Sequence, residues 1–343
     1  MEVVPLTELD DALFASALAV QQRAEQSVDP AIPAITGPEL RRWAAHDRTE
    51  GNRHDRFAIV AGDRARAVVH LELELDEANS HRANVEIFGA AWDLDAGTVG
   101  LIAALDIAET EDRTVITGWG PNTDDERRFW TGMGATLSLR ERVSALDMAT
   151  VDAELMDTWI ADGAERAPDV EIARWVDRCP DEYMAPWIES QMAMNDMPLG
   201  GLDINAWEID EDDVRRDEAT IGALGLRAVS MLAVDHEGRA AAHTRVHVNP
   251  TRPSASLQWD TAVVERHRGR GIGKWIKAAM WQRLRTEEPE VTRITTGNAQ
   301  SNGAMLAINI AMGYVPVIEF GAWQAPLAEM RSRLSRPESR SSG

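Results

Sequence analysis

The chain has 343 residues, 44% of them hydrophobic, which is enough for about two globular domains that each bury a core. Its 35 Lys and Arg residues against 57 Asp and Glu leave a net charge of −22, which repels nucleic acid and excludes it as an expected partner. The single cysteine, Cys179, excludes an internal disulfide framework and a cysteine zinc site, and agrees with a reducing, cytoplasmic location.

The N-terminal part of the chain is expected to begin without a leader and to continue as strands. Its first residues, MEVVPLTELDD, lack a basic n-region, and no segment approaches the ~20 apolar residues of a membrane span, so we expect no membrane partner. Residues 55–76 are typical of strand, glycine-containing turn and strand, and NVEIFGAAW (84–92) leads on through 93–105 into a helix.

A long stretch, residues 151–228, separates this part from the next strand-rich one. It carries four tryptophans, which are most often core residues: Trp159, Trp175, Trp187 and Trp207. The acidic run 208–218 lies on an expected helix and is best explained as a solvated face. No histidine pair has metal-ligand spacing, so we predict no metal.

The strands resume at 227–248, and the most informative segment follows. Residues 255–264 form an expected strand, and RHRGRGIGKWI (266–276) places four cationic side chains and three glycines before an apolar-faced helix that runs to Pro289. Glycines let backbone N–H groups approach an anion, and the helix directs its positive end at it. A small anionic ligand therefore explains the loop better than a solvated surface does.

The loop is neither a Rossmann nor a Walker loop. Its glycines run G-x-G-x-G, and Trp275 stands where a Walker loop needs a hydroxyl. After it, VTRITT (291–296) predicts a strand, and Asn302 can cap a helix that ends at Gly313 before a strand from Tyr314.

Arg268-x-x-Gly271-x-Gly273 is similar to the pyrophosphate loop of the GNAT superfamily of acyl-coenzyme A-dependent N-acyltransferases, and NAQSN…AIN…MGY resembles its next motif. The match covers residues 245–319. The resemblance implies that two parallel strands splay apart around the pantetheine arm, which pairs with the strand before the loop, while loop amides and arginines, Arg266 included, hold the diphosphate. The coenzyme-binding residues so implied are Ala262, Val263, Val264, Arg268, Gly269, Arg270, Gly271, Ile272, Gly273, Lys274, Asn298, Asn302 and Asn309.

An internal repeat indicates two copies of this fold. Residues 116–137 parallel 295–317 at an offset of 179, which matches Gly118 with Gly297. The first copy lacks the arginines and Gly-x-Gly and has Asp93 and Asp95 where phosphates would sit. We therefore predict an α/β (α+β) protein of two tandem GNAT folds, each a mostly antiparallel mixed sheet flanked by helices: a degenerate lobe at 1–147, an acetyl-CoA-binding lobe at 148–330 and a flexible tail at 331–343.

Acyl transfer to an amine needs a base, because an alkylammonium is mostly protonated at neutral pH. Asp260, near the middle of the key strand, and Glu265, at its end, are the candidates, and a structural network for Asp260 and a loop salt bridge for Glu265 are the alternatives. Counting back from Tyr314, the position of the family's proton-donating Tyr holds Asn309, which has no titratable proton and is expected to hydrogen-bond the coenzyme arm or sulfur.

The acceptor site is the least defined part of the sequence. Asn195 and Asp196 lie in a Pro- and Gly-bounded loop that resembles a segment of bacterial tandem-GNAT proteins, which suggests substrate binding and a cation contact for Asp196. We expect a monomeric or homodimeric N-acetyltransferase that uses acetyl-CoA and acts on a small-molecule amine, such as an antibiotic or specialised metabolite. The alternative is a non-catalytic coenzyme A-binding or interaction protein.

Overall fold

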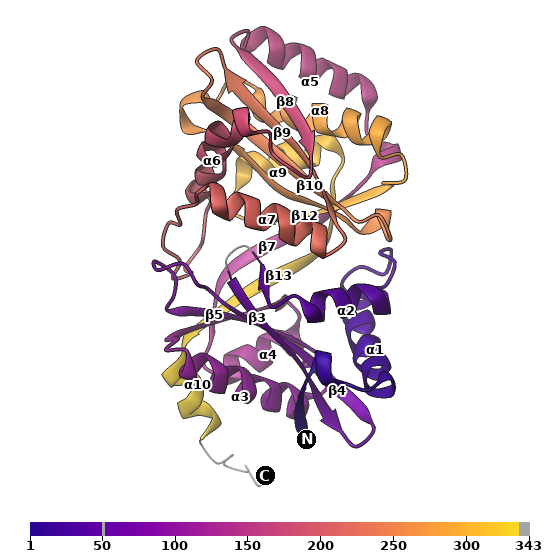
Figure 1. Cartoon of the computed structure of the whole chain (residues 1–343), viewed down its shortest axis with the longest axis vertical. Coiled ribbons are helices and arrows are strands. Elements are labelled where there is room, and N and C mark those ends of the chain that lie inside the picture. Colours follow the sequence, from indigo (N-terminus) through magenta and orange to yellow (C-terminus); the bar gives the residue numbers. More distant parts are fainter. Residues whose placement is uncertain (50–51, 336–343) are drawn as a thin grey trace.

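The strand-rich segments of the sequence join into one mixed sheet of 13 strands with helices on both faces (Figure 1). The structure is a computed structural model that describes residues 1–49 and 52–335. The strand order is β1-β3-β4-β5-β6-β13-β7-β12-β11-β10-β9-β8, with β2 paired to β3. Among the described pairs, β5 with β6 and β11 with β12 are parallel and the others antiparallel, which confirms the predicted fold class.

The N-terminal half is the part of the chain from β1 to β7. Its elements are β1 (Glu2–Pro5), α1 (Asp11–Val28), α2 (Gly37–Ala45), β2 (Arg48–Thr49), β3 (Asn52–Ala61), β4 (Arg64–Leu73), β5 (Arg82–Phe88), α3 (Leu94–Thr110), β6 (Val115–Pro121), α4 (Asp124–Gly132) and β7 (Thr136–Asp147).

The C-terminal half is the part from α5 to α10. Its elements are α5 (Ala153–Arg166), β8 (Val170–Val176), α6 (Met184–Met192), α7 (Glu211–Ala223), β9 (Arg227–Asp235), β10 (Ala240–Val248), β11 (Ser256–Val263), α8 (Ile272–Glu287), β12 (Arg293–Ala299), α9 (Gly303–Met312), β13 (Val315–Pro326) and α10 (Leu327–Leu334).

Local signals in the sequence set several of these boundaries. The side chain of Asn302 accepts a hydrogen bond from the Met305 amide at the start of α9, and Gly313 ends that helix in the left-handed conformation, both as predicted. A capping box of Asp210 and Asp213 starts α7, the helix of the acidic run. That run is not purely a solvated face, because Asp217 reaches inward to Arg245.

Each half has a separate core on each face of the sheet. In the C-terminal half, α5 and α8 cover the core that contains Trp159, while α6 and α7 cover the opposite core, which contains Trp175 and Trp187. In the N-terminal half, α1 and α2 lie on one face, and α3, α4 and α10 on the other. The predicted burial of these three tryptophans is confirmed, and Trp207 is half-buried.

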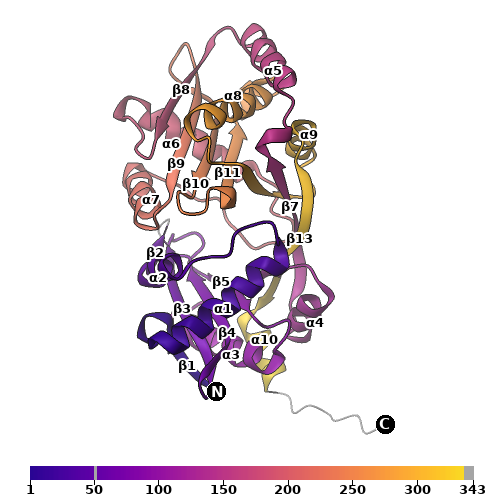
Figure 2. The same cartoon turned by 90° about the vertical axis from the view of Figure 1, so that its right-hand side faces the viewer.

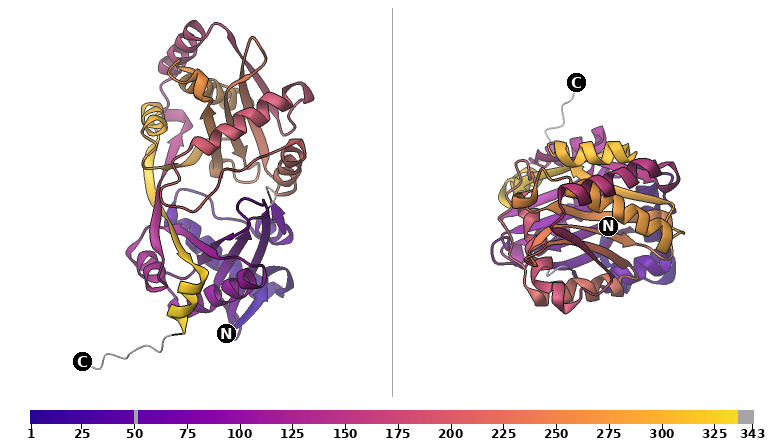
Figure 3. Two further views of the ribbon diagram at one scale, coloured as in Figure 1. Left: turned by 90° about the vertical axis from the view of Figure 1, so that its left-hand side faces the viewer. Right: turned by 90° about the horizontal axis from the view of Figure 1, so that it is seen from above.

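The two halves exchange their last strands. Strand β7 of the N-terminal half pairs with β12 of the C-terminal half, whereas β13 lies between β7 and β6. Figures 2 and 3 show β13 running from the upper half of the molecule down to α10 beside the lower half. Trp323 and Leu327 therefore pack into the core of the N-terminal half. Strand pairing thus crosses the 147/148 position at which the sequence suggested a boundary.

The predicted start of the flexible tail, residue 331, is wrong, because residues 331–334 belong to a helix. Helix α10 continues to Leu334, because Arg331 forms ion pairs with Asp106 and Glu109 of α3 at 2.5 and 3.2 Å. The rest of that prediction, 336–343, lies outside the described residues.

Candidate active site

The loop before α8 turns by means of two glycines in the left-handed conformation. Gly269 has φ 78° and Gly271 has φ 85°, values that other residues adopt at a cost, and α8 begins directly after Gly271. A Cβ on Gly273 would lie 3.3 Å from Val263 and 3.5 Å from Ile308, so the start of α8 packs closely against β11 and α9. The positive end of α8 is thereby presented beside β11.

The two parallel strands beside this loop separate early. Strand β11 pairs with β12 only at Ser256 with Ile294 and Leu257 with Thr295. The rest of the β11 edge has no ladder partner on that side among the described residues, so its backbone groups are open to a ligand. The exception is the Val263 carbonyl, which accepts a hydrogen bond from Nε of Arg268 at 3.1 Å. The early separation of the two strands is the splay that the resemblance implied.

A cleft of about 590 Å³ opens where the strands diverge. Its walls come from the end of β11, the loop and first turn of α8, the connection between α6 and α7, and the start of α9. The lining residues include Arg166, Asp196, Thr261, Ala262, Val263, Arg268, Gly269, Gly271, Ile272, Gly273, Lys274 and Asn302. Most of the predicted coenzyme-binding loop therefore lines one cavity.

The loop arginines are less free than the sequence suggested. Arg266 donates to Glu189 at 2.6 Å and Arg270 to Asp169, and these pairs anchor the loop to α6 and to the turn before β8. Neither arginine lines the cleft. Arg268 does, although it donates to Asp196 at 2.6 Å.

Arg166 is a cleft residue that the sequence analysis missed. It lies at the end of α5, and its Nη2 donates to the Gly269 carbonyl at 2.9 Å. Lys274, which also lines the cleft, lies 5.2 Å from the ring centroid of Trp159. Arg166, Arg268 and Lys274 thus place three cationic side chains in the lining of the cleft.

The three asparagines of the predicted coenzyme site have different surroundings. Asn302 lines the cleft while it caps α9. Asn309 is buried, and its Nδ2 donates to Oδ1 of Asn298 at 2.7 Å, so these two residues tie α9 to β12 outside the cleft lining. Val264 is likewise held elsewhere, since its amide donates to the Ala241 carbonyl of β10.

Asp260 lies within a buried ionic network. Its Oδ2 is 3.4 Å from both Arg245 and His243, and Arg245 also pairs with Asp217 of α7 at 2.5 Å. Burial opposes ionisation, but Arg245 and His243 hold the pKa of the carboxyl well below its usual range. These contacts favour the structural alternative for Asp260, because a carboxylate with so low a pKa is a weak base.

Of the other predicted site residues, Asn195 stabilises a loop and Glu265 is exposed to solvent. Asn195 binds both the amide and the carbonyl of Trp207, and so closes the α6–α7 connection on itself. Glu265 is exposed, and no ion pair among the described residues includes it, so the predicted loop salt bridge does not form.

The corresponding region of the N-terminal half is built differently. Strands β5 and β6 stay paired over five residues. Asp93 caps α3 by accepting from the Ala96 amide, and its other oxygen pairs with Arg66 at 2.5 Å, so a carboxylate occupies the start of this helix. A Cβ on Gly118 would collide with the buried ring of Trp130.

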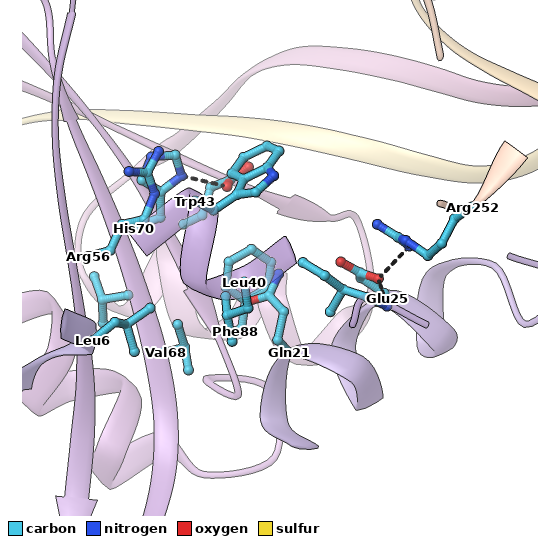
Figure 4. A pocket seen from close by; sticks show the side chains of 13 residues that line it. Leu6, Gln21, Glu25, Leu40, Trp43, Arg56, Val68, His70, Phe88 and Arg252 are labelled. Carbon is cyan, nitrogen blue, oxygen red and sulfur yellow. Dashed lines mark hydrogen bonds and ion pairs between the residues drawn. The ribbon is translucent and has the colours of Figure 1, made fainter. Parts of the chain in front are cut away.

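A cavity of about 110 Å³ lies elsewhere in this half, between α1, α2 and strands β3 to β5 (Figure 4). Trp43, Leu40 and Phe88 line it, and at one side Arg252 of the C-terminal half pairs with Glu25 at 3.5 Å. Two of the charged residues that line it, Glu25 and Arg252, therefore partner each other.

Within residues 1–49 and 52–335, no cluster of three or more His, Cys, Asp or Glu side chains could hold a metal ion. None of the helices in the described part of the chain combines the length and apolar character needed to cross a membrane.

No protein-family model and no curated protein sequence matches the chain. Among solved structures, it is similar to a tandem GNAT protein from the clavulanic acid biosynthesis pathway, at 25% identity and a TM-score of 0.74, over 95% of this chain and 98% of that one. A GCN5-related N-acetyltransferase from Sphaerobacter thermophilus is 12% identical, with a TM-score of 0.62 over 92% and 93% of the two chains. A glucosamine N-acetyltransferase region of a fungal β-N-acetylglucosaminidase is also 12% identical, with a TM-score of 0.60 over 90% of this chain and 37% of that one.

Proposed function

We propose, from the premise that this chain has a tandem GNAT fold, that it is an N-acyltransferase that moves an acetyl or longer acyl group from coenzyme A to a small-molecule amine. One observation carries the proposal. The loop before α8, in which two glycines adopt the left-handed conformation, lines the cleft beside the unpaired edge of β11. The fold alone would not support an activity, since function depends on the site.

The residues of the cleft suit an acyl-coenzyme A. Backbone amides of the 269–274 loop, with Arg166, Arg268 and Lys274, would bind the diphosphate through charge-assisted hydrogen bonds. The backbone of β11 from Thr261 to Val263 would pair with the amides of the pantetheine arm. The coenzyme itself supplies the activated thioester.

The chain's own contribution to the reaction is to place the amine and to remove its proton. The amine nitrogen attacks the thioester carbonyl carbon, the C–N bond forms as the C–S bond breaks, and the developing oxyanion needs a donor such as a backbone amide of β11. Asn309 has no titratable proton to give to the leaving thiolate, so we propose that solvent protonates the thiolate.

The acceptor is proposed to be a cationic amine. The net charge of −22 attracts such a substrate over long range. The 25% identical tandem GNAT protein comes from the clavulanic acid biosynthesis pathway, which supports a small-molecule acceptor.

Thiol release from acetyl-CoA with a panel of amines tests this function. Amine-dependent release would support it, and mass spectrometry of the product would identify the acylated nitrogen. Tight coenzyme binding without turnover would instead support the non-catalytic alternative, which the absence of a titratable group at Asn309 also fits.

A further inference from the structure

Glu141 belongs to the N-terminal half but lies beside β12 of the C-terminal half, next to the residues that line the cleft rather than among them. It lies on β7, the exchanged strand, where it pairs with Ala299 of β12 on one side and Phe320 of β13 on the other. Leu139, two residues earlier on the same face of the strand, packs with Ala299 and with Leu202 of the α6–α7 connection. Glu141 therefore points to the face of the sheet opposite α8.

The Glu141 carboxylate lies where the two parallel strands diverge. Its Oε2 is 3.2 Å from the position that a Cβ on Gly297 would occupy. Gly297 is two residues beyond Thr295, the last residue of β12 that pairs with β11. Because Gly297 has no side chain, the carboxylate can lie directly above the apex of the splay.

This carboxylate has no charged partner. No hydrogen bond or ion pair of the described residues includes it, and burial alone raises the pKa of Glu141 above its usual value. Its neighbours Gly297, Ala299, Phe320 and Leu202 do not titrate. The charged groups of the adjoining segments pair elsewhere: Arg140 with Glu319, Arg268 with Asp196 and His81 with Asp203.

The N-terminal half lacks this arrangement. Strand β13 lies beside β6 as β7 lies beside β12, so the registers can be compared. Matching the buried residues Ile116 and Ile294 gives an offset of 178, so the predicted match of Gly118 with Gly297 is wrong: a Cβ on Gly118 would point to Trp130 on the other face. With this offset, Trp119 corresponds to Gly297. Phe320, which pairs with Pro121, corresponds to Glu141, which pairs with Ala299. A carboxylate above an open glycine thus occurs on the side of the molecule that has the coenzyme cleft.

We infer that Glu141 is the general base of the C-terminal site, supplied by the N-terminal half through strand exchange. The inference rests on the proposed acyl transfer. Glu141 accepts a proton from the amine nitrogen as the C–N bond forms, the thiolate leaves with the C–S electron pair, and the proton passes to solvent while solvent protonates the thiolate. The products are the amide and free coenzyme A.

The test compares Glu141→Gln with wild type in amine-dependent thiol release between pH 6 and 10. The variant should lose roughly 10²- to 10⁴-fold in kcat at neutral pH and regain part of it as pH rises and the free amine becomes abundant. Glu141→Asp, which withdraws the carboxylate by one methylene, should lose less. Glu171→Gln, on the exposed edge strand β8, is the matched control and should keep wild-type rates.

Coenzyme affinity from calorimetry establishes whether each variant is folded, and it should be unchanged. Wild-type kcat and pH profile in folded Glu141→Gln would overturn the inference and leave the proposed function intact. Absence of turnover in the wild type with every amine would overturn both.

Discussion

Arg268 of the glycine loop before α8 donates from Nη2 to Oδ2 of Asp196, on the α6–α7 connection, at 2.6 Å. The two side chains are about half exposed, at 48% and 51%, and both line the cleft. The arginine that identifies the loop motif is therefore already neutralised, and a diphosphate would compete with Asp196 for it. In the proposed coenzyme site, Asp196 would therefore weaken binding of the diphosphate.

Replacing Asp196 with Asn is expected to strengthen coenzyme A binding by roughly two- to fivefold, the size of a partly exposed ion pair. Arg268→Ala should weaken binding. Calorimetry at low and high salt measures both, and the gain from Asp196→Asn should shrink at high salt because screening weakens the pair. Weaker binding in Asp196→Asn would show that the carboxylate supports the coenzyme site.

The two left-handed glycines allow a controlled test of the loop. Gly269 has φ 78° and Gly238, in the turn between β9 and β10, has φ 76°, and neither has an atom within 4 Å of an added Cβ. Alanine at either position should cost about 1–2 kcal/mol of folding stability, because the strain is the same. We expect coenzyme affinity to fall at least tenfold in Gly269→Ala alone, because Gly269 lines the cleft and Gly238 does not. Equal affinities in the two variants would contradict this role.

Asp260→Asn separates a structural from a catalytic role. Removing one partner of the buried network with Arg245 and His243 should lower the free energy of unfolding by about 3–5 kcal/mol, measured by urea denaturation. The exposed Asp203→Asn is the control and should change stability little. An Asp260→Asn protein of wild-type stability that turns over slowly at neutral pH and recovers at high pH would restore Asp260 as the base.

Lys277 predicts a pH dependence of stability. It is buried in α8, and burial lowers the pKa of its amine from 10.5 to about 7. Between these pH values Lys277 binds more protons in the unfolded chain than in the folded one. The free energy of unfolding therefore rises with pH from 7 to 10.5 because of this residue. Lys277→Met should raise the free energy of unfolding at pH 7 by about 1–3 kcal/mol and flatten that rise. If the free energy of unfolding of the wild type and of Lys277→Met rose equally with pH, Lys277 would not be the source of the pH dependence.

The sequence sufficed for the parts of the site that are local in the chain. The glycine spacing, the Asn302 cap and the Gly313 stop are decided within a few residues, and each was predicted with its structural role. The partners of the loop arginines were not predictable in this way. Asp169 and Glu189 lie far from Arg270 and Arg266 in sequence, and the loop's positive charge gave no sign that these acids neutralise it.

The strand exchange was also hidden from the sequence. An alternating pattern shows which side of a strand is buried but not which strand lies beside it, so β7 and β13 were assigned to the halves in which they occur in the chain. Glu141 was missed for the same reason, since its neighbours Gly297 and Ala299 are more than 150 residues away. Arg166 was missed because it ends a helix that meets the loop only through tertiary packing.

The number of coenzyme A molecules bound by one chain tests the division between the halves most directly. Titration calorimetry should give one equivalent per chain, because the left-handed loop and its cleft occur in the C-terminal half while Asp93 occupies the corresponding helix start. Gly271→Val should abolish that binding, since valine cannot readily adopt φ 85°. Two equivalents per chain, or one that persists at unchanged affinity in Gly271→Val, would show that the N-terminal half is a working coenzyme site.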